Sequence, residues 1–138
     1  MIEVTELREV LKKRNGLLEQ VLDITRKQPA LIEAEETDQL LQNIALRQNL
    51  LDELAALMEG LPEENRRARD PECSALDRTS HEIYAMIAEQ DKTNENAAQA
   101  RLDDIKTRLR AVRDGKTAFT AYEKAGGDPG ATYFDKKR

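Results

Sequence analysis

The sequence has no tryptophan, a single cysteine, and only 4% aromatic residues. So few bulky side chains argue against a large globular core. The lone Cys73 excludes an intramolecular disulfide and a zinc site built from several cysteines, and it is typical of reducing compartments. The longest uninterrupted apolar run, Leu54–Met58, is far shorter than the roughly 20 residues of a membrane-spanning helix, and Met1 leads directly into charged residues. We therefore expect a cytoplasmic protein with neither a secretory signal nor a membrane insertion.

Charge is what the sequence has in abundance, since 36% of its residues are charged and 39% are hydrophobic. This composition suits either a disordered chain or a set of long helices, and hydrophobic periodicity distinguishes the two. The net charge of −5 conceals a gradient from −7 over residues 1–64, through −2 over residues 65–100, to +4 over residues 101–138. A pI near 5.1, with aspartates alternating with the basic residues, argues against nucleic acid as a partner.

Apolar residues at spacings of three, four and seven predict an amphipathic helix at the start of the chain. It is expected to run from about Glu3 to at least Lys27. Pro29 then either ends or kinks this helix, because proline lacks a backbone donor and disfavours helical geometry at the residue before it. A turn is expected somewhere in residues 28–38.

A second apolar stripe predicts a second helix, which completes a hairpin over about residues 3–59. Thr37 or Asp38 is expected to cap its start, and Gly60 to stop it in the left-handed conformation. The stripe of this helix comprises Leu40, Leu41, Ile44, Leu50, Leu51, Leu54, Leu57 and Met58.

Residues 60–70 are polar and basic, and they predict a connector with one helical turn. In the tripeptide Asp70-Pro71-Glu72, an aspartate cap precedes a proline at the first helical position and an acidic residue near the positive end of the helix dipole. A helix should therefore begin here. No glycine or proline follows until Gly115, which predicts one long helix over about residues 71–114.

This long helix extends to residue 125 in our prediction, and residues 126–138 are predicted to form a flexible tail. Its apolar positions weaken between residues 90 and 98, a polar middle of the kind that sets helix register or exchanges partners. The sequence thus predicts an all-α fold: an elongated antiparallel bundle or coiled coil of three long helices, with residues 1–125 as a single domain.

The second half of the long helix carries an apolar stripe that the hairpin is too short to cover. At about 1.5 Å per residue the hairpin spans about half of the long helix. Three coverings are open: a second copy of the chain in a homodimer, an amphipathic segment of another protein, or the chain's own tail. The homodimer is the simplest of the three, and we expect the chain to form a homo-oligomer. The candidate protein-binding residues on this stripe are Leu102, Ile105, Leu109, Val112, Phe119 and Tyr122.

Tyr133 and Phe134 complete the set of candidate protein-binding residues. They lie in a tail otherwise rich in glycine and charge, where aromatic residues are unusual. A pair of aromatic anchors on a basic tether suits a segment that docks, either on a partner or on its own bundle.

The sequence offers little support for enzyme chemistry. The only histidine, His81, has no second histidine four residues later as a zinc-protease helix requires, and Cys73 would lie about two helical turns away from it. No glycine-rich phosphate loop is present. We therefore predict no catalytic residues, no metal site and no cofactor.

Taken over its whole length, the chain resembles the small helical flagellar type III export chaperones of the FlgN and FliT type. The resemblance rests on the order of three segments. An N-terminal leucine-rich hairpin holds "LLEQVLDITRKQPALIEAEETDQLLQNIALRQNLLDEL", the second half holds "IAEQDKTNENAAQARLDDIKTRLRAVRDGKTAFTAYEK", and the chain closes with "ATYFDKKR".

This resemblance implies a cytosolic chaperone that keeps a late flagellar structural protein soluble until export. The client would be a hook–filament junction protein or the filament cap protein, and its disordered terminal helix would be held in an apolar groove. The stripe from Leu102 to Tyr122 is then the client surface. For the tail with Tyr133 and Phe134, contact with export machinery and masking of the stripe both stay open. The alternative is a structural homodimeric coiled-coil scaffold with no client.

Overall fold

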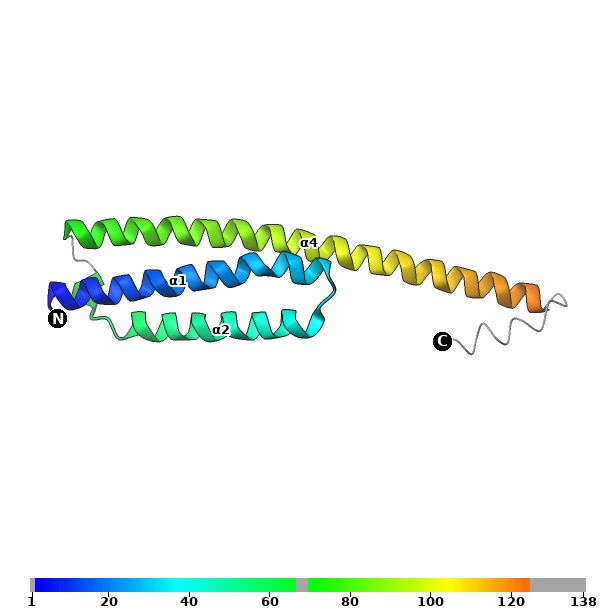
Figure 1. Cartoon of the computed structure of the whole chain (residues 1–138), viewed down its shortest axis with the longest axis horizontal. Helices are drawn as coiled ribbons and strands as arrows, with labels where there is room; N and C mark the ends of the chain where they lie inside the picture. The colour runs from blue at the N-terminus through cyan, green and yellow to red at the C-terminus, as the bar shows by residue number, and fades with distance from the viewer. Residues whose placement is uncertain (1, 67–69, 125–138) are drawn as a thin grey trace. The chain divides into compact units, whose positions relative to one another are not determined.

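The structure is a computed structural model that describes residues 2–66 and 70–124. These residues form helices α1 (Val4–Glu33), α2 (Thr37–Glu59), α3 (Glu63–Arg66) and α4 (Pro71–Lys124), and they include no strand. Figure 1 shows the three long helices, so the predicted all-α class is confirmed for the described part of the chain. The predicted tail, residues 126–138, lies outside the described residues.

The chain divides into two structural units, residues 1–98 and residues 99–138. The first holds α1, α2, α3 and the beginning of α4, and the described part of the second is the remainder of α4. The predicted assignment of residues 1–125 to one domain stays a prediction. Gly115 lies inside α4, so the predicted extension of the long helix beyond residue 114 is continuous with it.

Pro29 neither ends nor shortens the first helix, because α1 continues to Glu33. The turn that follows is a Schellman motif, in which the Glu36 N–H donates to the Leu31 carbonyl (3.0 Å) and the Glu35 N–H to the Ile32 carbonyl (3.2 Å). Glu35 takes the left-handed position of this motif with φ 56°. The turn thus lies within the predicted range of residues 28–38, but glycine is the usual residue at the left-handed position, so the sequence did not mark its exact place.

Two predicted details of α2 are wrong. Its N-cap is Glu36, which makes no side-chain capping hydrogen bond, so neither Thr37 nor Asp38 is the cap. At the other end Gly60 has φ −71°, in the right-handed helical region. The helix therefore ends without a left-handed residue, and the Gly60 N–H donates to the Ala56 carbonyl at 3.2 Å.

The predicted helix start at Asp70-Pro71-Glu72 is confirmed. α4 begins at Pro71, and the Cys73 N–H donates to Asp70 Oδ2 at 3.2 Å. The Arg8 guanidinium of α1 donates to both carboxylate oxygens of Asp70, at 3.0 and 3.2 Å. This hydrogen bond to Arg8 lowers the pKa of Asp70 from 3.8 to about 2, and the Cys73 N–H contributes in the same direction.

We expect the Arg8–Asp70 pair to make stability sensitive to acid. In the folded state the pKa of Asp70 is lowered to about 2, whereas in the unfolded chain it is about 3.8. The ion pair therefore stabilises the fold above pH 3.8, and this contribution is lost as the pH falls through about 2. Asp70→Asn keeps a capping side chain but removes the charge. The melting temperature of this variant, followed from about pH 5 to pH 2, should therefore fall less than that of the wild type.

Asp23→Asn is the matched control, because it removes an exposed carboxylate from α1. The melting temperature of this variant should change with pH as that of the wild type does. Identical acid profiles for Asp70→Asn and the wild type would show that this ion pair makes no pH-dependent contribution.

Two apolar clusters form the core of the first unit. The larger joins all three long helices, and its buried members are Leu17, Leu18, Val21, Leu22, Leu50, Leu54, Ile83 and Ile87. The smaller packs against the first turns of α1 and comprises Leu7, Leu11, Leu61 and Cys73. Several buried leucines at about 1.5–3 kcal/mol each are the main stabilisation of this unit.

A buried polar layer formed by Arg14 and Asn15 joins α1 to α4. The Arg14 guanidinium donates to Asp77 Oδ1 at 2.9 Å and to the Leu76 carbonyl at 3.1 Å. The Asn15 amide donates to the same carbonyl at 3.0 Å. Burying a guanidinium group without hydrogen-bond partners destabilises the folded state. An arrangement of α1 and α4 that moved Arg14 away from Asp77 and Leu76 would therefore be unfavourable, and these hydrogen bonds favour the observed register.

A second polar layer surrounds Pro29. Proline has no N–H, so the carbonyl of Thr25, four residues earlier, lacks its helical donor. The buried Asn94 side chain of α4 supplies one instead, with its amide nitrogen 2.9 Å from the Thr25 oxygen. Asn43 of α2 likewise donates to the Ile24 carbonyl at 2.9 Å. Asn94 thus satisfies the carbonyl that Pro29 leaves without a helical donor, and Asn43 adds a hydrogen bond to the carbonyl next to it.

Gln28 links the two asparagines. Its side-chain oxygen accepts from Asn94 at 3.1 Å, and its side-chain nitrogen donates to Asn43 Oδ1 at 3.0 Å. Gln90 donates to Asn94 Oδ1 at 2.8 Å. The polar middle of the long helix, recognised in the sequence, is therefore a hydrogen-bonded layer between three helices that favours one register.

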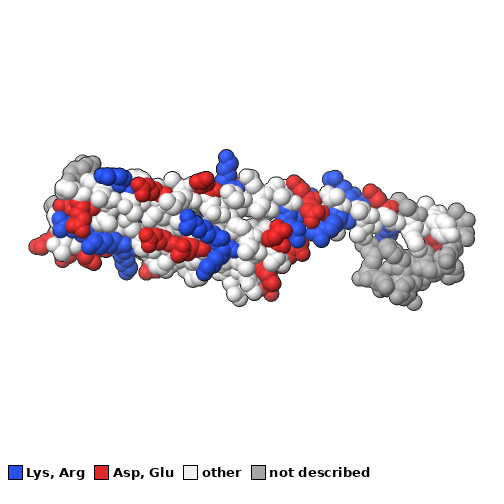
Figure 2. Space-filling model, turned by 45° about the horizontal axis from the view of Figure 1, so that its top comes forward, with Lys and Arg blue, Asp and Glu red and all other residues white. Residues whose placement is uncertain are grey.

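Charged side chains of both signs are scattered over the surface of the first unit. On the face drawn in Figure 2, Lys and Arg side chains are interspersed with Asp and Glu side chains along these helices. One of the ion pairs joins α2 to α4, where Arg47 donates through two nitrogens to the two carboxylate oxygens of Asp91. This pairing raises the pKa of Arg47 above its ordinary value.

Candidate protein-binding surface

The predicted stripe lies on the second half of α4 and is exposed. The exposed fractions are 45% for Leu102, 38% for Ile105, 63% for Leu109 and 46% for Val112. Their spacings of three and four residues place these four side chains on one face of the helix, and we call them the aliphatic stripe. Of the other candidates, Tyr122 is exposed and Phe119 is partly buried. Tyr133 and Phe134 lie outside the described residues.

The aliphatic stripe has enough apolar surface to drive an association. Complete burial of a large aliphatic side chain is worth about 1.5–3 kcal/mol, and four of them follow one another over three helical turns. Contiguous exposed apolar surface on a soluble protein marks an interaction site more often than an isolated exposed leucine does. Leu109, the most exposed of the four, also lines a surface hollow together with Lys106, Arg110 and Arg113.

A second exposed apolar surface, on the first half of α2, was not anticipated. Leu41, Ile44 and Leu46 are all exposed, whereas the sequence prediction placed Leu41 and Ile44 on the core side of this helix. Only Leu50 and Leu54 of α2 are buried. The sequence does indicate that some of these residues are exposed. The apolar residues at 40, 41, 44 and 46 point to several sides of a helix, and one neighbouring helix cannot bury them all.

This surface continues into an open groove between α1, α2 and the first unit's part of α4. The groove is lined by apolar residues, Ile32, Leu40 and Ile44, and by the Arg47–Asp91 ion pair. Asn94 and Gln28 of the proline layer also line it.

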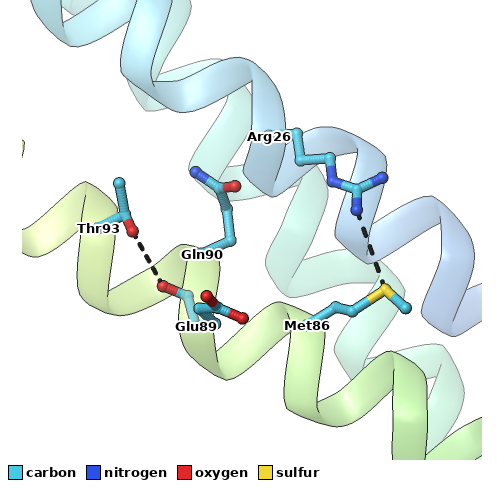
Figure 3. A pocket seen from close by; sticks show the side chains of 5 residues that line it. All are labelled: Arg26, Met86, Glu89, Gln90 and Thr93. Carbon is cyan, nitrogen blue, oxygen red and sulfur yellow. Dashed lines mark hydrogen bonds between the residues drawn. The ribbon is translucent and has the colours of Figure 1, made fainter.

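A smaller pocket between α1 and α4 is mainly polar (Figure 3). The Arg26 guanidinium points toward the sulfur of Met86, 3.9 Å away. The Thr93 hydroxyl donates to the Glu89 carbonyl at 3.2 Å, within its own helix. Glu89, Gln90 and Thr93 thus offer ordinary polar contacts, and no pattern in the sequence predicted a role for this pocket.

The residues considered for catalysis do not come together. Cys73 is buried in the smaller apolar cluster, whereas His81 is exposed on α4. Burial raises the pKa of the Cys73 thiol, which disfavours the nucleophilic thiolate. Across residues 2–66 and 70–124, no three His, Cys, Asp or Glu side chains are grouped as a metal site. In the same residues, no helix is both long and apolar enough to cross a membrane.

No protein-family model matches this chain, and no curated protein or solved structure matches it either. The resemblance to the flagellar export chaperones therefore rests on the sequence segments that suggested it. The geometry of the aliphatic stripe is independent of that resemblance.

Proposed function

We propose that this chain is a cytosolic flagellar export chaperone. In this proposal the aliphatic stripe binds an amphipathic terminal segment of a late flagellar structural protein, which is either a hook–filament junction protein or the filament cap protein. The bound segment is kept from premature assembly and is presented to the export apparatus. We also propose that the three long helices form an antiparallel, coiled-coil-like bundle that supports the stripe.

The observation that carries this proposal is the exposure of Leu102, Ile105, Leu109 and Val112, which is between 38% and 63%. An apolar helix face of this length matches the way amphipathic helices bind partners, through anchors three and four residues apart. The order and composition of the sequence segments that resemble the flagellar chaperones supply the identity of the client class.

The test is a measurement of mass in solution. The full chain is mixed with peptides that correspond to the terminal segments of the junction and cap proteins of the same organism, and size exclusion with light scattering reports the complex. We expect one peptide class to form a complex of defined stoichiometry. A stable homodimer that ignores every peptide would contradict the proposal and support the homodimeric scaffold instead.

A further inference from the structure

The charges that border the aliphatic stripe are all of one sign. At 3.6 residues per turn, Arg101 and Arg108 border it on one side, and Lys106 and Arg113 border it on the other. Residues 99–116 contain six basic side chains and only three acidic ones, at Asp103, Asp104 and Asp114. The basic residues are thus concentrated where a partner's own flanking side chains would lie.

The three acidic residues lie farther around the helix. Asp103 and Asp114 are on the side opposite the stripe, as the helical repeat requires. Asp104 lies behind the first border, where its Oδ2 atom is 3.7 Å from Arg101 and 3.0 Å from Arg108. One carboxylate therefore interacts with two guanidinium groups. On the other border, Lys106 and Arg113 line the hollow at Leu109 together with Arg110.

This arrangement disfavours a second copy of the chain as the occupant of the stripe. When two helices pair through such a stripe, the residues on its borders face those of the partner and set partner choice and orientation. In a parallel homodimer Arg101 would face Lys106, and Arg108 would face Arg113. In an antiparallel homodimer the Arg101–Arg108 border would face the same border of the second chain, and the Lys106–Arg113 border would do likewise, so basic residues would again face basic residues. Both pairings place like charges together.

From these borders we propose that the aliphatic stripe binds an amphipathic helix of another protein whose apolar face is flanked by Asp and Glu residues. This inference rests on the proposed function and specifies the chemistry of the client segment. The apolar anchors supply most of the affinity, and the acidic flanks supply the choice of partner and a faster encounter. The interaction is sensitive to salt, because the border charges are at the surface.

Two designed peptides of 21 residues test this proposal. Both carry the same leucine and isoleucine stripe with three- and four-residue spacing, one flanked by glutamate and the other by lysine. Like-charged flanks also keep each peptide from pairing with itself. Fluorescence anisotropy with the full chain should show that the glutamate peptide binds about tenfold more tightly at about 0.05 M salt. The difference should shrink toward twofold at about 0.5 M salt, where screening is stronger.

Charge reversal provides the decisive variant. Lys106→Glu combined with Arg113→Glu reverses one border and leaves Arg101 and Arg108 basic on the other, so the preference for the glutamate peptide should disappear and the two peptides should bind about equally. The matched control is Arg78→Glu combined with Lys92→Glu, which changes the total charge equally at exposed positions of the first unit. This control should keep the preference for the glutamate peptide. Circular dichroism verifies that the variants retain their helix content.

The outcomes separate this inference from the proposed function. Equal binding of both peptides by the wild type, or an unchanged preference in the Lys106→Glu, Arg113→Glu variant, would overturn the acidic-partner inference but leave the chaperone proposal standing. If neither peptide binds and the chain is instead a homodimer closed through the stripe, both proposals are wrong.

Discussion

Replacing Leu109 and Val112 together by glutamine should abolish capture of the client segment while leaving the protein folded. These side chains are 63% and 46% exposed, so the folded chain loses little when they become polar. A bound helix, in contrast, would lose two apolar contacts of about 1.5–3 kcal/mol each, which corresponds to a loss of affinity of at least about a hundredfold. Glutamine keeps a good helix propensity and adds no charge. Titration calorimetry with the peptide that binds the wild type measures the loss.

The control for this variant lies on the opposite face of the same helix. Thr107→Gln combined with Ala111→Gln alters two exposed positions on the side away from the stripe, and affinity should stay within about twofold of wild type. A Leu109→Gln, Val112→Gln protein that loses its helical circular dichroism would show that these residues belong to a core, and the assignment of the site would then be wrong. Full binding by a folded variant would equally refute it.

The second large effect concerns the layer around Pro29. Asn94→Ala should destabilise the first unit by about 2–4 kcal/mol, because it leaves the Thr25 carbonyl and the Gln28 side-chain oxygen without the donor they now share. Asn96→Ala is the matched control on the same helix. Asn96 is exposed, so its loss should cost less than about 0.5 kcal/mol. Urea unfolding followed by circular dichroism gives both values.

A double-mutant cycle then isolates the role of the proline. In the Pro29→Ala background the new backbone N–H can satisfy the Thr25 carbonyl within α1, so the Asn94→Ala substitution should cost about 1–2 kcal/mol less than in the wild type. Additive effects of the two substitutions would mean that Asn94 does not compensate for the missing donor, and our explanation of the uninterrupted helix would fail.

The helices and most of their ends were predictable from local sequence. Periodic leucines predicted α1 and α2, and the Asp70-Pro71-Glu72 cap predicted the start of α4 at the correct residue. The turn after α1 was predicted within residues 28–38 and lies there, but its exact position was not, because Glu35 adopts the left-handed conformation that glycine usually takes. Whether Pro29 would end or kink α1 also stayed open, since the donor that replaces its missing N–H comes from Asn94, far along the chain.

Of the two exposed apolar surfaces, only the one on α4 was predicted from the sequence. Exposure of the aliphatic stripe followed from a comparison of helix lengths, which a sequence provides directly. The exposed face of α2 was missed: apolar residues at 40, 41, 44 and 46 indicate that some of them are exposed, but the helical period does not show whether Leu41 or Leu50 faces the neighbouring helices. Only the placement of α1 and α4 determines that Leu50 is buried and Leu41 is exposed.

By itself the sequence determined an all-α chain, the presence of three long helices, the start of α4, and an apolar stripe on the second half of that helix. These are local properties, because helix propensity, capping and periodicity act over a few residues. The tertiary structure decided which apolar residues of α2 are buried and how the polar middle of α4 is used. Those outcomes depend on contacts between residues up to 69 positions apart, such as Thr25 and Asn94, which no local pattern encodes.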